Sequence, residues 1–214
     1  PSASSTQDLA RKSMEVPSAW AAEIQTAGRG RQGHAWASDR PLGLWCSVML
    51  EPEAHQLPIL SMLGSLAAAD AIRALTDCET TLKWPNDLML SHDGAGWRKL
   101  AGVLPRLRWR GGAVCWAQVG IGLNGCNPVP PAVSLRQASG RSVPRAQMLA
   151  AFLDSLTHRL TQTSTEILED FRAHWGQSGR AVRVRSGDQE IHGWADQVDE
   201  AGHLHLRLPD GFVR

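Results

Sequence analysis

Apolar side chains recur with helical spacing in three segments of the chain, at residues 57–75, 148–160 and 167–175. Each segment keeps one hydrophobic face and therefore predicts a helix. A further helix is predicted over residues 6–15, because Ser5 is a favourable N-cap and Asp8 follows three residues later, as in a capping box.

Short apolar segments between glycine, proline and polar turns predict strands. They cover residues 19–24, 44–50, 80–84, 88–90, 99–107 and 112–123. Three more alternating segments, at 181–185, 190–198 and 203–208, follow a linker at 176–179. The order of elements predicts an α+β fold. A domain over residues 1–176 carries a mixed β-sheet packed with helices, and residues 180–214 form a small β module.

Composition narrows the class of protein. The 214 residues are 43% hydrophobic, and 22 basic against 21 acidic side chains leave a net charge of +1. This excludes a disordered chain and gives no reason to expect DNA or a membrane as partner. The four cysteines lack metal-site or disulfide-scaffold spacing, and no signal peptide is visible, so we expect a cytoplasmic protein.

Positive charge is concentrated locally. Residues 94–153 contain no acidic side chain but eight basic ones, which favours an anionic ligand such as a phosphate. Only three of the 22 basic residues are lysines, and two of these, Lys83 and Lys99, lie beside glycine, proline or asparagine. Lysine is a compact point charge suited to a reacting phosphate, so both are candidate site residues. Chance use at two surface positions is the alternative.

Two segments, 28–33 and 120–125, match the pattern Gly-x-Gly-x-x-Gly. Neither is expected to open a helix, so a dinucleotide-binding fold is excluded, and His34 stands where a Walker loop needs lysine. The first segment still combines flexible glycines with Arg29 and Arg31, which suits a loop that closes over an anion. His203 and His205 share one strand face, for which a solvated surface is favoured over a metal site.

Five motifs occur in one order along the chain. They are Ser-Thr-Gln at 5–7, Gln-Thr-Ala-Gly-Arg-Gly-Arg-Gln-Gly at 25–33 followed by Trp36, Lys-Trp-Pro-Asn-Asp at 83–87, Lys-Leu-Ala-Gly at 99–102 and Gly-Ile-Gly-Leu-Asn at 120–124. In these motifs the chain resembles the biotin protein ligases, of the type without a DNA-binding domain. The resemblance implies a class II synthetase-like catalytic domain followed by a small SH3-like domain.

The resemblance also implies substrates and partners. Biotin and ATP would form biotinyl-5′-AMP, with Mg²⁺ carried on the ATP phosphates and no metal site in the protein. The biotinyl group would then pass to a lysine of a biotin carboxyl carrier protein. The enzyme would act as a monomer or homodimer.

Site residues follow from the same resemblance, motif by motif. The implied catalytic residues are Lys99, Asp87 and Arg29. Biotin would be bound by Ser5, Thr6, Gln7, Gln25, Gly28, Arg29, Gly30, Arg31, Lys99, Gly102 and Gly122. ATP and the adenylate would be bound by Arg29, Arg31, Trp36, Lys83, Asn86 and Asn124. An ion pair with Asp87 is an alternative role for Lys83.

The sequence departs from the family pattern at three places. Gln7 replaces the usual asparagine, and the segment 132–135 offers only Ala132 or Val133 where some members stack a tryptophan on adenine. The chain also ends before the last strand usual in the terminal domain, so we expect an incomplete β module. The competing interpretations are a lipoate–protein ligase of the same fold and a non-catalytic biotin or adenylate sensor.

Overall fold

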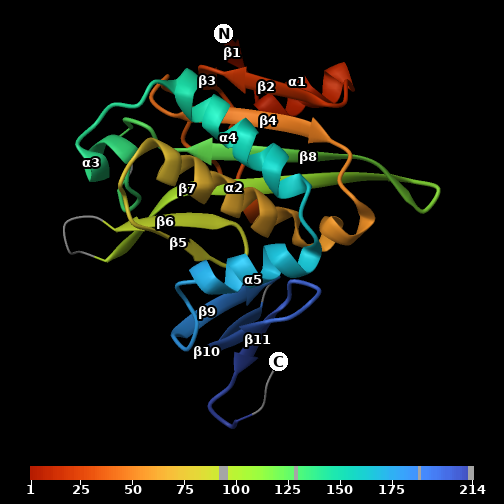
Figure 1. Ribbon diagram of the computed structural model, residues 1–214, viewed down its shortest axis with the longest axis vertical. Helices are drawn as coiled ribbons and strands as arrows, with labels where there is room; N and C mark the ends of the chain where they lie inside the picture. Colours follow the sequence, from red (N-terminus) through yellow and green to blue (C-terminus); the bar gives the residue numbers. More distant parts are fainter. Residues whose placement is uncertain (92–95, 128–129, 188, 212–214) are drawn as a thin grey trace.

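The computed structural model describes residues 1–91, 96–127, 130–187 and 189–211. At its centre is a six-stranded sheet with the strand order β2-β4-β8-β7-β6-β5 (Figure 1). The strands are β2 (Ser18–Ala22), β4 (Leu44–Leu50), β5 (Thr80–Lys83), β6 (Asp87–Ser91), β7 (Trp97–Arg110) and β8 (Ala113–Leu123). All neighbours in this sheet are antiparallel, whereas β1 (Ser2–Ala3) pairs in parallel with β3 (Ile24–Gln25) beside it.

The helices are α1 (Thr6–Ser13), α2 (Leu60–Leu75), α3 (Leu135–Ser139), α4 (Arg145–Leu160) and α5 (Ser164–His174). The predicted helix over 57–75 is α2 preceded by a 3₁₀ segment, Ala54–Ile59, that contains Pro58. Most of the run Ala54–Leu75 is buried, so a helix long and apolar enough to cross a membrane serves here as a core helix. The short helix α3 was not predicted, because five residues show no periodicity.

The first helix begins after Ser5 as predicted, but the predicted role of Asp8 is wrong. The Ser5 hydroxyl accepts a hydrogen bond from the backbone N–H of Gln7. The Asp8 carboxylate instead accepts hydrogen bonds from Ser4 Oγ and from the Arg29 guanidinium. A long-range ion pair therefore replaces the local capping interaction.

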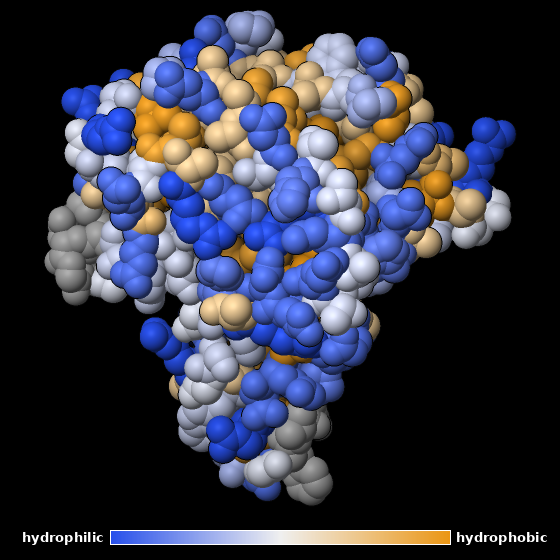
Figure 2. All heavy atoms as spheres, viewed as in Figure 1, coloured by the Kyte–Doolittle hydropathy of each residue, from blue (hydrophilic) through white to orange (hydrophobic). Residues whose placement is uncertain are grey.

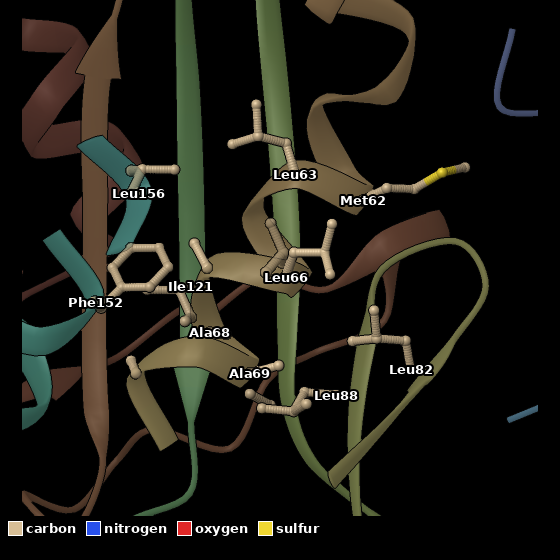
Figure 3. Packing of buried hydrophobic residues seen from close by; sticks show 14 of the residues in the cluster. Met62, Leu63, Leu66, Ala68, Ala69, Leu82, Leu88, Ile121, Phe152 and Leu156 are labelled. Atoms are coloured by element: carbon tan, nitrogen blue, oxygen red, sulfur yellow. The ribbon is translucent and has the colours of Figure 1, made fainter. Parts of the chain in front are cut away.

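Side-chain alternation divides the central sheet into two faces. Val103 of β7 and Val119 of β8 pack beneath Gly64 of α2, where an added Cβ would come within 2.7 Å of Val103. Figure 3 shows residues of α2 and α4 packed over Ile121 of the same face. Gly102 and Gly122 lie at the intervening positions and so face the other side of the sheet, away from α2.

The C-terminal module is a separate sheet of β9 (Ala181–Ser186), β10 (Gln189–Val198) and β11 (Leu204–Arg207), in the order β11-β10-β9. It packs below α5, and its outer surface in this view is largely hydrophilic (Figures 1 and 2). Trp84 Nε1 donates to the carbonyl of Gly202 at 3.0 Å, and Arg172 Nε donates to that of Val198 at 2.8 Å. The expected end of the module at residues 212–214 lies outside the described residues.

Candidate active site

A cleft of about 760 Å³ opens on the sheet face opposite α2. Its wall is built by α1, the glycine-rich loop at 28–36, the strands β7 and β8, the β5–β6 turn and the C-terminal module. The sequence-predicted residues that line it are Ser5, Thr6, Gln7, Gln25, Arg29, Gly30, Arg31, Trp36, Lys83, Asn86, Asp87, Lys99, Gly102 and Gly122. The fold thus brings together motifs that are more than 100 residues apart.

One end of the cleft is polar but uncharged. Gln25 Oε1 accepts hydrogen bonds from the backbone N–H of Thr6 at 2.8 Å and from its hydroxyl at 3.2 Å. The Thr6 hydroxyl also lies 2.9 Å from Ser47 Oγ, and Gln25 Nε2 donates to Ser38 Oγ. All four side chains are buried, so the network holds donors and acceptors in fixed positions, as recognition of a neutral polar ring requires.

Gln7 contributes a further buried group beside this network. Its Nε2 donates to the carbonyl of Leu104 at 3.1 Å, and its backbone carbonyl accepts from Gln118. Its Oε1 is buried without a hydrogen-bond partner among the described residues. A Cβ at position 120 would lie 2.8 Å from Gln7 Nε2. Gly120 therefore leaves room for a glutamine, which is one methylene longer than the asparagine usual at position 7.

Charged groups meet in the middle of the cleft. Lys99 Nζ lies 2.7 Å from Asp87 Oδ1 and 5.1 Å from the centre of the Trp36 ring. Asp87 therefore forms its ion pair with Lys99 and not with Lys83, although Lys83 and Asp87 are cross-strand partners in β5 and β6. Lys83 lines the same cleft with an exposed side chain, so it remains a candidate for phosphate.

A pair of glycines forms the floor beneath Trp36. Gly102 and Gly122 are directly opposite each other in β7 and β8. A Cβ at position 122 would lie 2.4 Å from the Trp36 ring, and one at 102 would lie 3.1 Å from both the ring and Lys99 Nζ. Only glycines leave the slot in which the indole lies, and the buried Trp36 Nε1 has no hydrogen-bond partner among the described residues.

The glycine-rich loop is a small hairpin rather than an unstructured turn. Its base is closed by a bridge between Arg29 and Ala35 and by hydrogen bonds from the backbone N–H groups of Gly30 and Trp36. Its tip is a 3₁₀ turn, Arg31–Gly33, so the prediction that no α-helix begins here is confirmed. At the tip, Arg31 donates to Asn86 Oδ1 at 3.3 Å.

Two predicted residues do not line the cleft. Gly28 packs behind the loop, where an added Cβ would lie 2.3 Å from Ser38 Oγ. Asn124 is buried, donates to the carbonyl of Val133 and accepts from Asn127. Both shape the backbone around the site.

Other cleft residues were not predicted. The C-terminal module supplies Arg183, Arg185 and Leu204 to the wall, and no local motif marked them. Cys46 also lines the cleft, but burial raises the pKa of its thiol to about 12, so it stays protonated and is no nucleophile. His203 and His205 both lie against Asp199 Oδ2, at 3.4 and 2.9 Å, and no group of three His, Cys, Asp or Glu side chains in the described part of the chain is placed to hold a metal ion.

Known proteins are similar to this chain in sequence. The profile of the Biotin/lipoate A/B protein ligase family matches residues 1–124. The chain is 32% identical over 199 residues to the biotin–[acetyl-CoA-carboxylase] ligase of Mycobacterium tuberculosis, which covers 86% of this chain and 71% of the relative. It is 29% identical over 207 residues to the bifunctional ligase/repressor BirA of Bacillus spizizenii, covering 90% of this chain but only 62% of that relative.

Solved structures share the fold. Biotin protein ligase from Aquifex aeolicus, in complex with biotin and ATP, is 26% identical with a TM-score of 0.81, covering 100% of this chain and 91% of that chain. The ligase from Leishmania major, with biotinyl-5-AMP, has a TM-score of 0.71 at 23% identity, covering 100% and 95%. These similarities confirm the predicted α+β class.

Proposed function

The chain belongs to the biotin/lipoate A/B protein ligase family, and we propose that it is a biotin–protein ligase acting in the cytoplasm. It would activate biotin with ATP to biotinyl-5′-AMP and transfer the biotinyl group to a lysine of a biotin carboxyl carrier protein. We further propose that residues 1–176 form the catalytic domain and residues 180–214 the SH3-like module. The observation that carries the proposal is the meeting of a neutral polar end and a cationic centre in one cleft.

In the first step, a biotin carboxylate oxygen attacks the α-phosphorus of ATP, a P–O bond forms, and pyrophosphate leaves. Both reactants are anions, so the step needs fixed positive charge around the reacting atoms. Lys99 and Arg31, which both line the cleft, supply it. Ser5, Thr6 and Gln25 bind the uncharged ureido ring at the polar end.

In the second step, the ε-amine of the carrier lysine attacks the acyl carbon of the mixed anhydride. The C–N bond of the amide forms, the acyl–phosphate bond breaks, AMP leaves, and the amine loses a proton. Asp87, whose Oδ1 lies 2.7 Å from Lys99 Nζ, is the carboxylate beside the reacting groups. It orients the incoming amine and accepts its proton.

Mg²⁺ is expected to enter with the nucleotide. The resemblance to biotin ligases implies that the ion would be carried by the ATP phosphates. Bound there, it would offset the negative charge that develops on the leaving pyrophosphate. The residues of this chain bind and orient the reactants.

The direct test is to incubate the protein with ATP, Mg²⁺ and an acceptor carrier domain, with biotin in one reaction and lipoate in another. We expect the carrier mass to rise by one biotinyl group only in the biotin reaction. A mass increase with lipoate alone would establish the lipoate–protein ligase instead. An unchanged mass in both reactions, with biotin still bound, would indicate a sensor.

Arg31 and Arg29 differ in how much charge they can offer a ligand. Arg29 is paired with the carboxylate of Asp8, whereas Arg31 touches only the neutral amide of Asn86 among the described partners. We therefore expect Arg31→Ala to speed release of biotinyl-5′-AMP ten- to a hundredfold, because a charged hydrogen bond to phosphate is lost. The release rate, measured by trapping the free adenylate, checks this, and an unchanged rate would contradict it.

A further inference from the structure

Asp8 lies on the first turn of α1, next to the cleft but not among its lining residues. Both its oxygens accept hydrogen bonds from Arg29, with Nη1–Oδ1 at 2.8 Å and Nη2–Oδ2 at 2.9 Å. The Asp8 side chain is only 14% exposed. This parallel, two-point pairing is the strongest geometry available to an arginine and a carboxylate.

The surroundings keep the Asp8 carboxylate charged and fixed. Ser4 Oγ donates to Oδ2 at 3.1 Å, and the Arg11 guanidinium lies 3.5 Å from Oδ1. The hydrogen bond from Arg29 is the main reason that the pKa of Asp8 is lowered from its usual value. Burial and the charge of Arg29 lower the pKa of Arg106, and the charge of Asp8 opposes this shift. The single Asp8 carboxylate therefore offsets the positive charge of several neighbouring guanidinium groups.

The pair is formed at the base of the glycine-rich loop, where Arg29 bridges to Ala35. The contacts at the tip are weaker. Arg31 lies 3.3 Å from Asn86 Oδ1, and Gln32 Nε2 lies 3.4 Å from the carbonyl of Arg185 in the C-terminal module. The loop is thus held by one strong charged contact at its base and by long contacts at its tip.

We propose that Asp8 is a positioning residue that anchors the glycine-rich loop through Arg29 and so leaves Arg31 as the guanidinium that meets the ligand's anion. The part that concerns the ligand rests on the proposed biotin ligase function. The anchoring itself does not, because it is a property of the loop.

The test compares wild type with Asp8→Asn, which keeps the shape of the side chain but removes its charge. Two readouts are used: the rate of tryptic cleavage after Arg31, which reports loop opening, and the rate of biotinyl-5′-AMP release. We expect both rates to rise about tenfold. Arg11→Gln is the matched control, since it removes a cation from the same carboxylate but lies outside the loop, and both rates should change less than twofold.

A double-mutant cycle separates anchoring from a general loss of stability. Once Asp8 is asparagine, adding Arg29→Gln should change the rate of cleavage after Arg31 by less than twofold, because the partner is already lost. Unchanged cleavage and release in an Asp8→Asn protein that melts like wild type would overturn the proposal. Slower release would overturn it too, because Arg29 would then bind phosphate when freed. Faster cleavage in a protein that forms no adenylate would support the anchor and refute the ligase function.

Discussion

Replacing Lys99 by methionine is expected to slow formation of biotinyl-5′-AMP by about a hundred- to a thousandfold. The substitution keeps most of the unbranched side chain but removes the ammonium that lies in the cleft beside Asp87. It also leaves the Asp87 carboxylate without this partner, so a negative charge then faces the two anions that must react. The rate of pyrophosphate release with saturating biotin and ATP measures the effect.

Three further variants show whether the loss is one of charge. Lys99→Arg should fall between wild type and Lys99→Met, because the charge remains but the point-like geometry is lost. Adding Asp87→Asn to Lys99→Met should recover part of the first step, since the uncompensated carboxylate is removed. Lys12→Met, on the exposed surface of α1, should change the rate less than twofold. Near-normal pyrophosphate release by Lys99→Met would disprove the role of Lys99.

Local patterns predicted the elements of the central sheet and the long helices because each of these has its own periodicity. Strand β4, for example, is buried throughout and apolar except at Ser47, and it was predicted with its bounds, Leu44–Leu50. The ordered motifs likewise indicated most of the residues that line the cleft, although Gly28 and Asn124 lie outside it. The variants of Lys99, Asp87 and Arg31 test whether these cleft residues have their proposed roles.

The pairing of charges could not be predicted from spacing. Lys83 is four residues from Asp87 and directly opposite it, yet Asp87 pairs with Lys99. The reason is Gly102, which lies opposite Asp87 on β7 and has no side chain. The space this leaves is occupied by the Lys99 side chain, whose Nζ would be 3.1 Å from a Cβ at position 102.

Contacts between segments far apart in the chain also could not be predicted from the sequence. Asp8 and Arg29 are 21 residues apart, and Gln32 and Arg185 are 153 apart. Such pairs depend on how α1 and the C-terminal module dock against the sheet, and tertiary docking has no signature in a short window of sequence. The module's share of the cleft wall was missed for the same reason.

The network around Arg159 gives the largest expected effect on stability. This buried side chain joins three helices, because Nε lies 2.7 Å from Asp70 Oδ2 of α2, and Nη1 donates to Asp170 of α5 and, at 3.0 Å, to Gln162. We expect Arg159→Met to lower the free energy of unfolding by about 2–4 kcal/mol, because it leaves partly buried carboxylates without their shared partner. Urea denaturation at pH 7 measures the difference.

The pH dependence distinguishes lost charge from lost packing. Burial by itself would raise the pKa of Asp70, but hydrogen bonds from Arg159 and Arg73 outweigh it, so the pKa is lowered in the folded protein. A lowered pKa stabilises the fold above the unfolded value of about 4, and this contribution is lost as the pH falls through the folded value. The gap between wild type and Arg159→Met should therefore narrow below about pH 4. A gap that stays constant would mean that Arg159 contributes packing and not charge. Arg73→Met, at a more exposed site, is the matched control and should lower the free energy of unfolding by less than about 1 kcal/mol.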